Sequence, residues 1–342
     1  MPLVTVIIPA YNAEDYIERC VRSVLAQTHP ALRLLVVDDG STDRTGEILD
    51  ALSREDARLV PLHVENGGPA AARNRALDTL GPETDYILFS DADDEMPPDA
   101  LAYALREGAG ADLVLMGFSI VQPDGSRRDY SEPLERLGPD TLGAALGRLY
   151  KANLLNQVWA KLFRASLILD AGIRFADYRW GEDRLFVYDC LERACSVAVL
   201  PECKYRYLMH PGESLITKYY DRKLEVCVRS DRRMQALCRR FGVEDERDFR
   251  YMFMKSVFSC LTTLYAPSCP LSPAERRAEI EGILRDDAVR ERNRDVFGGA
   301  PVQLLCAVVR SGSVPLNDLC FRAVARAGTL APRLFTRLKH QK

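Results

Sequence analysis

The order of apolar and amphipathic segments in the first 120 residues constrains the fold more strongly than any other feature of the sequence. Short apolar segments at residues 3–8, 33–37, 58–64 and 86–90 have the length and composition of buried strands. The segment at residues 13–27 carries apolar residues at helical spacing, namely Ile17, Cys20, Val21, Val24 and Leu25. Strands that alternate with helices form a mostly parallel sheet with helices on both faces, so we predict a Rossmann-like α/β fold.

The rest of the chain divides by composition. Residues 125–149 are polar and interrupted by glycine and proline, which predicts a loop, whereas the pattern toward the C-terminus becomes helical and highly charged. We therefore expect one domain over residues 1–218, with an N-terminal half at residues 1–120 and a second half at residues 150–218. A helical C-terminal region is expected to follow at residues 219–342.

Composition and charge exclude several classes of protein. The net charge of −3 provides no positive field for nucleic acid, so we expect no nucleic-acid partner. The ten cysteines form no C-x-x-C pair and no zinc-site spacing, which indicates reduced thiols packed as small apolar groups. The N-terminus lacks the pattern of a signal peptide, and apolar runs such as residues 304–309 are far shorter than the ~20 residues of a spanning helix. We expect a cytoplasmic protein, soluble or peripheral to the membrane.

Three carboxylates, Asp91, Asp93 and Asp94, follow directly after the fourth expected strand. Ligands of parallel α/β sheets bind beyond the carboxyl ends of the strands, so this is a favourable place for a site. Adjacent carboxylates repel one another, and their oxygens suit Mg²⁺ or Mn²⁺ that also contacts a phosphate. The alternative is a solvated acidic turn before the helix that follows Pro97 and Pro98.

Two further acidic pairs lie where a ligand could meet them. Asp38 and Asp39 end the second expected strand, where a carboxylate can accept a hydrogen bond from a base imide or a ribose hydroxyl. Glu182 and Asp183 follow Trp180, and a carboxylate beside a tryptophan can be desolvated and thereby fitted to accept a proton. The alternatives are a tight Asp-Gly turn for the first pair and an acidic helix N-terminus for the second.

Other catalytic patterns are missing from the sequence. The four histidines are scattered, there is no G-x-S-x-G elbow, and no G-x-G-x-x-G follows the first strand. These observations argue against a serine hydrolase and a dinucleotide-dependent oxidoreductase. Among the histidines, His210 lies next to Pro211 and Gly212 and can contact a phosphate, whereas His29 beside Pro30 suits a loop.

Four stretches together resemble the family 2 glycosyltransferases of bacterial polysaccharide synthesis. They are residues 4–12 (VTVIIPAYN), 36–43 (VVDDGSTD), 66–74 (NGGPAAARN) and 89–94 (FSDADD). Their order, their spacing and their placement at strand ends all agree with the family. Later stretches at residues 159–163, 181–183 and 205–214 extend the resemblance to about residue 218, and the helical C-terminal third matches no motif.

The resemblance implies a GT-A fold and a nucleotide-sugar donor, commonly a UDP-sugar. Carried over to the matching positions, it implies that the nucleotide-sugar is bound by Pro9, Tyr11, Glu14, Asp39, Arg73, Asn74 and Asp91. Asp39 would read the base, and Asp93 would hold the Mg²⁺ or Mn²⁺ cofactor. Asp183 would be the general base that deprotonates the acceptor hydroxyl, so that a single displacement inverts the anomeric configuration.

The C-terminal segment predicts a further interaction. Residues 320–342 carry six Lys or Arg residues and no acidic residue, interleaved with apolar side chains. A basic amphipathic segment of this kind can lie on an anionic membrane surface, which would suit a glycan or lipid-linked acceptor at the inner face of the membrane. The alternative is a terminal helix packed on the protein with a solvated basic face.

Two other functions stay open at the level of sequence. A sugar-phosphate nucleotidyltransferase also places acidic residues and a metal at strand ends, but it needs a Gly-rich triphosphate loop where residues 9–12 stand. A non-catalytic nucleotide-sugar-binding protein is the second alternative. It would not need to retain Asp39, Asp91, Asp93 and Asp183 together.

Overall fold

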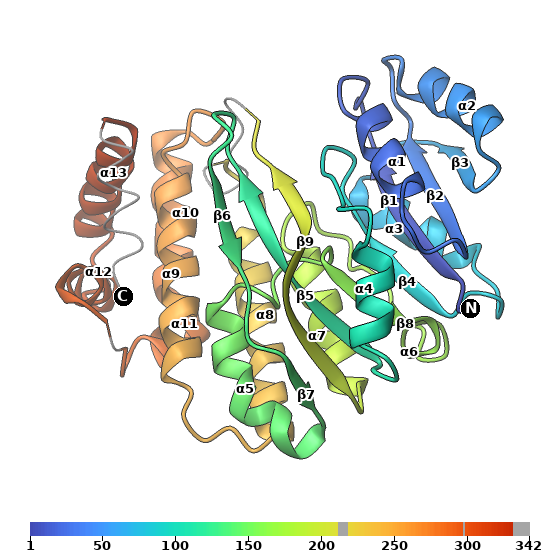
Figure 1. Cartoon of the computed structure of the whole chain (residues 1–342). Helices are drawn as coiled ribbons and strands as arrows, with labels where there is room; N and C mark the ends of the chain where they lie inside the picture. The colour runs from blue at the N-terminus through green and yellow to red at the C-terminus, as the bar shows by residue number, and fades with distance from the viewer. Residues whose placement is uncertain (211–217, 297, 331–342) are drawn as a thin grey trace. The chain divides into compact units, whose positions relative to one another are not determined.

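The computed structural model describes residues 1–210, 218–296 and 298–330 of the chain, with the side chains of residues 328–330 left aside. The chain divides into two compact units. The first comprises Met1–Gly212 and Leu237–Gly242, and the second comprises Glu213–Ala236 and Val243–Lys342. The first unit holds the β-sheet, and the described residues of the second unit form helices (Figure 1).

The four strands predicted in the first 120 residues all form. They are β1 (Val4–Ala10), β2 (Leu32–Asp39), β3 (Leu59–Val64) and β4 (Tyr86–Phe89). These strands lie side by side in the order β3-β2-β1-β4, and every pair is parallel. Most of their side chains are buried because helices cover both faces of the sheet, which is why the strands read as continuous apolar runs.

The sheet continues through strands that the sequence did not all reveal. They are β5 (Leu113–Val121), β6 (Arg127–Tyr130), β7 (Glu135–Leu137), β8 (Lys161–Arg164) and β9 (Val197–Leu208). The short strand β8 lies between β4 and β5 and is antiparallel to both. β9 pairs with β5 in parallel, and the nine strands form one mixed sheet.

The prediction of a loop at residues 125–149 is wrong. β6 forms a hairpin with β5 around Gly125, which adopts a φ of +81°, and β7 pairs with β9. Helix α5 (Pro139–Lys151) then begins with Pro139 in its first turn and buries Leu142, Leu146 and Leu149. The glycine and proline residues therefore mark a hairpin turn and a helix start rather than an irregular segment.

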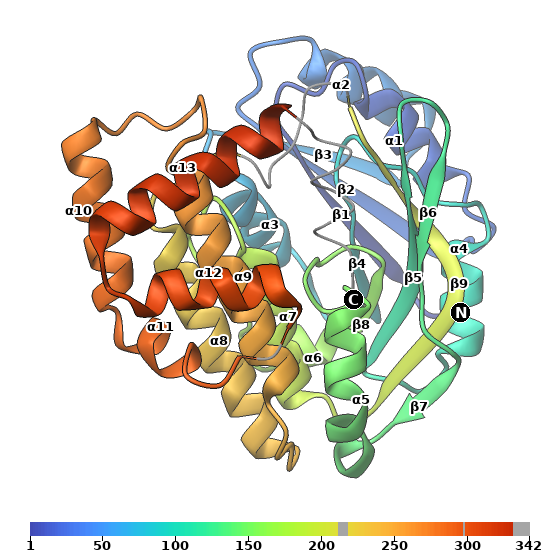
Figure 2. The same ribbon diagram turned by 90° about the vertical axis from the view of Figure 1, so that its left-hand side faces the viewer.

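Helices cover both faces of the sheet, as Figure 2 shows. One face carries α1 (Ile17–Leu25), α2 (Thr45–Glu55) and α4 (Ala100–Glu107), and the other carries α3 (Pro69–Asp78), α6 (Ala165–Leu169) and α7 (Glu182–Arg193). On the first face, the Gln27 side chain after α1 accepts a hydrogen bond from the backbone of Leu101 in α4, across 2.9 Å. The predicted α/β fold class is confirmed, with additional antiparallel pairing through β6, β7 and β8.

The predicted helical C-terminal region is also confirmed. The second unit contains the first part of α8 (Lys223–Arg240), α9 (Arg247–Thr263), α10 (Pro273–Arg285), α11 (Asp287–Arg292), α12 (Ala300–Arg310) and α13 (Val314–Leu330). Its core includes Phe253, Met254 and Leu261 of α9. A buried ion pair of 2.8 Å joins Arg292 to Asp231. Within the described ranges, no helix has both the length and the apolar character needed to cross a bilayer.

Candidate active site

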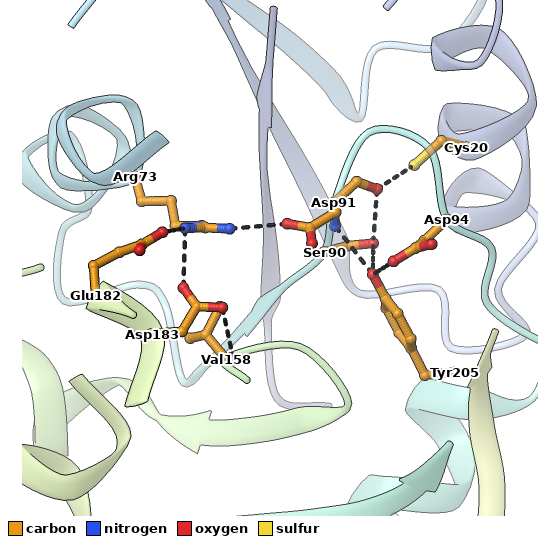
Figure 3. Close-up of polar contacts among 9 residues, drawn as sticks. All are labelled: Cys20, Arg73, Ser90, Asp91, Asp94, Val158, Glu182, Asp183 and Tyr205. Carbon is orange, nitrogen blue, oxygen red and sulfur yellow. Dashed lines mark hydrogen bonds and ion pairs between the residues drawn. The ribbon is translucent and has the colours of Figure 1, made fainter. Parts of the chain in front are cut away.

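The carboxyl ends of β1, β2 and β4 meet at one edge of the sheet because the three strands are parallel. The residues that end or follow these strands, including Tyr11, Asp39 and Asp91, are therefore brought to the same edge. The first turn of α7 adds Glu182 and Asp183 from a distant part of the chain (Figure 3).

The three carboxylates after β4 differ in their surroundings. Asp91 and Asp93 are partly exposed, whereas Asp94 is completely buried. Asp94 accepts hydrogen bonds from the Tyr205 hydroxyl at 2.7 Å and from the backbone N–H of Leu208 at 2.9 Å. Burial and the charges of Asp91 and Asp93 raise the pKa of Asp94 well above its ordinary value, against the effect of the Tyr205 hydrogen bond. Asp94 thus fastens the strand-end turn to β9 and does not present itself to a ligand.

Tyr205 is a candidate functional residue to which the sequence assigned no role. Its buried hydroxyl donates to Asp94 and accepts a hydrogen bond of 3.0 Å from the backbone N–H of Asp91. Its ring stacks on Trp159 with the ring centroids 4.7 Å apart. The Tyr205 hydroxyl therefore fixes the position of the Asp91 backbone.

Arg73 of α3 lies at the centre of the site. Its side chain is almost fully buried, and Nη2 donates to Asp91 Oδ1 at 2.8 Å. Nη1 donates to Asp183 Oδ1 at 3.1 Å and to Glu182 Oε1 at 3.3 Å (Figure 3). The charges of Asp183, Asp91 and Glu182 raise the pKa of Arg73, although burial acts in the opposite direction. This guanidinium joins the strand-end carboxylate to the acidic pair on α7.

The acidic pair on α7 occupies the first turn of the helix, after Gly181, which adopts a φ of +81°. Asp183 Oδ2 accepts a second hydrogen bond, 3.2 Å long, from the backbone N–H of Val158. Glu182 is buried, and burial followed by the Asp183 charge raises the pKa of Glu182 to about 7, against the attraction of Arg73. The two neighbouring carboxyl groups thus have distinct environments, which is how paired acids divide catalytic roles.

Asp39 is engaged with the glycine-rich loop before α3. Its two carboxylate oxygens accept hydrogen bonds from the backbone N–H groups of Gly67 at 2.9 Å and Gly68 at 2.7 Å. The Asn66 side chain donates in turn to the backbone carbonyl of Asp39 at 2.8 Å. Each carboxylate oxygen keeps a second lone pair that can accept a hydrogen bond from a ligand.

The segment after β1 is held against the turn that follows β2. Asn12 adopts a φ of +47°, and its side-chain oxygen accepts a 2.8 Å hydrogen bond from the backbone N–H of Thr42. Glu14 similarly accepts a hydrogen bond from the backbone of Arg44, and Tyr11 remains about half exposed. These contacts keep Pro9, Tyr11 and Glu14 beside the strand edge, where a nucleotide could reach the exposed Tyr11 ring.

Asn74 lies outside the carboxylate cluster. Its side-chain amide donates to the backbone carbonyl of Phe175 at 2.9 Å and accepts from the backbone N–H of the same residue at 2.8 Å. The Phe175 ring lies 5.3 Å from the Arg73 guanidinium carbon. Asn74 therefore acts on the site by fixing the segment on which Arg73 rests.

His210 faces the second carboxylate of the strand-end cluster. Its Nε2 lies 3.4 Å from Asp93 Oδ2, and the ring packs against Tyr16 at a centroid distance of 4.2 Å. The Nε2 atom is buried and makes no hydrogen bond within the described part of the chain. Across the same residues, no group of three or more His, Cys, Asp or Glu side chains is already arranged around a common metal position.

Lys161 is a second functional candidate without a predicted role. It lies on β8, is 1% exposed, and its Nζ approaches the Trp159 carbonyl at 3.4 Å. Burial lowers the pKa of Lys161 to about 7, although the Asp183 charge opposes this shift. The only signal in the sequence was a lysine inside the apolar stretch at residues 159–163.

Comparison with known proteins places this site in a family. The sequence profile described as Glycosyl transferase family 2 matches residues 5–161, which include β1 to β4, the loop before α3 and the strand-end acids. The chain resembles this family over residues 5–161. The predicted resemblance is therefore confirmed, and the protein is a glycosyltransferase.

Curated relatives of this glycosyltransferase include proteins of Bacillus subtilis. The chain is 29% identical over 306 residues to the uncharacterized glycosyltransferase EpsJ, which covers 86% of this chain and 87% of EpsJ. It is 42% identical over 132 residues to the putative teichuronic acid biosynthesis glycosyltransferase TuaG, covering 37% of this chain and 51% of TuaG.

Solved structures with a similar fold include complexes with nucleotide-sugars. The crystal structure of residues 1–349 of S. aureus TarS in complex with UDP-GlcNAc matches with a TM-score of 0.67 at 22% identity, covering 95% of this chain and 92% of that one. The mannosyltransferase PcManGT from Pyrobaculum calidifontis, in complex with GDP-Man and Mn²⁺, matches with a TM-score of 0.52 at 17% identity, covering 97% and 88%. These matches agree with the predicted GT-A fold.

Proposed function

We propose that this glycosyltransferase moves a sugar from a UDP-linked donor to a hydroxyl group of a glycan or lipid-linked acceptor, with inversion, in cell-surface polysaccharide synthesis. The observation that carries the proposal is the bridge that Arg73 forms between Asp91 and Asp183. Asp91 lies at the carboxyl end of a strand, which is where ligands bind in such sheets, and Asp183 is a carboxylate of the kind that accepts protons in catalysis. The UDP-GlcNAc complex of TarS supports the donor, and the name of TuaG, a putative teichuronic acid biosynthesis glycosyltransferase, supports the pathway class.

The donor site in this proposal occupies the sheet edge. Its residues are Pro9, Tyr11, Glu14, Asp39, Arg73, Asn74 and Asp91. Asp39 reads the base through the lone pairs that its contacts with Gly67 and Gly68 leave available. Asp91, positioned by Arg73 and Tyr205, faces the ribose and the diphosphate, and Asn74 contributes through Phe175.

A divalent cation, Mg²⁺ or Mn²⁺, fits beside this donor site. Asp93 offers a carboxylate, and the buried Nε2 of His210 lies 3.4 Å from it and makes no hydrogen bond to any residue that the structure describes. Nitrogen and oxygen ligands of this kind suit Mn²⁺, and the Mn²⁺ complex of PcManGT supports the choice. When bound, the cation would offset the negative charge that develops on the departing nucleoside diphosphate.

Asp183 is the general base of the proposed reaction. The Arg73 guanidinium and the Val158 N–H hold its two oxygens in place. As the acceptor oxygen attacks the anomeric carbon, its proton passes to Asp183, and the bond to the diphosphate breaks with both electrons on the leaving oxygen. Attack from the face opposite the leaving group inverts the configuration.

The domain organisation follows from the same reasoning. We propose that residues 1–218 form the catalytic domain, with the donor half at residues 1–120 and the acceptor half at residues 150–218. The helical region at residues 219–342 would bring the enzyme to the inner face of the membrane through its basic C-terminal segment. Of that segment, residues 331–342 lie outside the described residues.

A donor screen combined with an Asp183→Asn variant tests the function. Purified enzyme is incubated with a panel of UDP- and GDP-sugars, with and without Mn²⁺, and release of nucleotide is measured. We expect Mn²⁺-dependent turnover of a UDP-sugar, and we expect Asp183→Asn to abolish transfer while UDP binding by calorimetry is unchanged. Full activity of Asp183→Asn, or a product that retains the donor's anomeric configuration by NMR, would contradict the mechanism.

A further inference from the structure

The helical second unit contains a cavity lined by four arginines. Arg276 and Arg277 come from α10 and Arg322 and Arg326 from α13, while Tyr265 completes the wall. The cavity volume is about 730 Å³, which is the size of pockets that bind small ligands. Four guanidinium groups around one cavity repel one another, so their position calls for an anionic partner.

Only part of this positive charge is balanced within the described residues. Asp318 of α13 pairs with Arg322 at 2.6 Å and lies 3.7 Å from Arg277. The Tyr265 hydroxyl donates to the same carboxylate. Neither Arg276 nor Arg326 has an acidic group within ion-pair distance among the residues that the structure describes. Four guanidinium groups thus share one carboxylate, and the cavity keeps an excess of positive charge.

Two donors on the cavity wall also lack hydrogen-bond partners. The Nε atoms of Arg276 and Arg322 are buried and make no hydrogen bond within the described ranges. Both guanidinium groups are nevertheless held in place, because they lie 5.0 and 5.8 Å from the Tyr265 ring centroid. Arg276 also donates through Nη2 to the Leu271 carbonyl at 3.2 Å. Because these Nε atoms have almost no exposed surface, an anion in the cavity would bind the terminal nitrogens of the same guanidinium groups.

We propose that this cavity binds a phosphate group, as a phosphomonoester or a diphosphate. The planar fork of a guanidinium matches two phosphate oxygens, and a carboxylate would occupy only one such fork. A phosphate carries up to two charges and several acceptor oxygens, so it can engage arginines from both α10 and α13 at once. The phosphate could belong to a lipid headgroup or to a soluble compound, since both present the same oxygens.

The exposed arginines allow a test that spares the protein core. Arg277 and Arg326 are exposed, and Arg277 approaches Asp318 only at 3.7 Å, so Arg277→Gln/Arg326→Gln should fold normally. The matched control is Arg285→Gln/Arg294→Gln, which removes the same charge from exposed positions elsewhere in the second unit. Equal melting temperatures of the three full-length proteins confirm that folding is intact.

The first arm measures binding of inorganic pyrophosphate by calorimetry in EDTA, so that metal-assisted binding at the donor site is suppressed. We expect the double variant to bind at least about tenfold more weakly than the wild type and the control. The second arm measures cosedimentation with vesicles of phosphatidylcholine alone or mixed with phosphatidic acid. If the double variant alone also binds less to the vesicles that contain phosphatidic acid, the phosphate belongs to a lipid headgroup.

The outcomes distinguish a lipid headgroup from a soluble phosphate compound, and one outcome contradicts the proposal. Weaker pyrophosphate binding with unchanged vesicle binding indicates a soluble phosphate compound. Equal binding of pyrophosphate and of phosphatidic acid vesicles by all three proteins overturns the proposal. Because Arg277 and Arg326 lie outside the proposed active site, this result would leave the transfer reaction untouched.

Discussion

Arg73 donates a hydrogen bond from Nη1 to Asp183 Oδ1 across 3.1 Å, although the two residues are 110 positions apart in the sequence. The same buried guanidinium binds Asp91 through its other terminal nitrogen. An arginine cannot lose its charge in a protein, so it can pair with both carboxylates whenever they are ionised. One side chain thereby sets the distance between the proposed donor site and the proposed base.

Replacing Arg73 by lysine should therefore distinguish the effect of its positive charge from the effect of its bridging geometry. A lysine keeps the positive charge but cannot bridge Asp91 and Asp183 with two planar N–H groups. We expect Arg73→Lys to lower kcat by about 10²-fold to 10³-fold, since misplaced catalytic groups have effects of this size. Initial rates at saturating donor measure this loss. Arg75→Lys, an exposed position on the same helix, is the control and should retain full activity.

The Tyr205 hydroxyl should contribute to stability as well as to the site. Tyr205→Phe leaves the buried Asp94 without one hydrogen-bond donor and the Asp91 N–H without its acceptor. We expect the free energy of unfolding to fall by about 1–3 kcal/mol, as for other buried polar groups that lose a partner. Urea unfolding measures this change. Tyr86→Phe should cost far less, because its contact with Arg164 is made by the ring. A Tyr205→Phe protein as stable as the wild type would contradict the role of the hydroxyl.

Much of the first unit could be predicted because its signals are local. Buried parallel strands require apolar runs, and residues after such strands lie at one sheet edge, so β1 to β4 and the positions of Asp39 and Asp91 follow from sequence. The antiparallel strand β8 could not be predicted in the same way. Its four residues carry no periodic signal of their own, and its partners β4 and β5 lie far away in the chain.

Other errors arose where tertiary contacts override local patterns. The segment predicted as helical from residue 13 forms α1 only from Ile17, and the preceding Asn12 adopts a left-handed conformation in which its side chain accepts a hydrogen bond from the Thr42 N–H. Trp180 was expected to desolvate the acidic pair, yet the Arg184 guanidinium lies 4.5 Å from the centre of its ring. The burial of Glu182 instead accompanies its contact with Arg73, which no spacing rule predicts.

His63 should make the stability of the first unit depend on pH. Its imidazole lies 2.8 Å from Asp38 and 3.1 Å from Asp50, and hydrogen bonds to Asp38 and then Asp50 raise the pKa of His63 in the folded state. A histidine whose pKa is higher in the folded state than in the unfolded state stabilises the folded protein. This stabilisation is complete below the unfolded-state pKa of about 6.5 and is lost as the pH rises through the folded-state pKa. Because His63 is half exposed, we expect an effect below about 1 kcal/mol.

Thermal unfolding between pH 6 and pH 8, near the ordinary histidine pKa of about 6.5, measures this dependence. The melting temperature of the wild type should fall with rising pH, and His63→Gln should remove part of that slope. His29→Gln is the control, because His29 contacts the Pro2 carbonyl and no carboxylate is recorded beside it among the described residues. An identical slope in wild type and His63→Gln would show that Asp38 and Asp50 do not stabilise the imidazolium.

The proposed cation site gives a prediction that does not depend on turnover. His210 Nε2 lies 3.4 Å from Asp93 Oδ2 and makes no hydrogen bond to the described residues, and a cation could bind both side chains. Removing either ligand should weaken Mn²⁺ binding by about 10-fold to 100-fold, the range seen when groups that support a metal site are lost. Electron paramagnetic resonance of free Mn²⁺, titrated with protein in the presence of UDP, measures the affinity of Asp93→Asn and His210→Ala.

The control is Asp99→Asn. The wild-type Asp99 carboxylate pairs with Lys204 at 2.6 Å, so this variant should bind Mn²⁺ like the wild type. If His210→Ala alone retains wild-type affinity, the cation is held by the carboxylates and the diphosphate, and His210 serves only to pack against Tyr16.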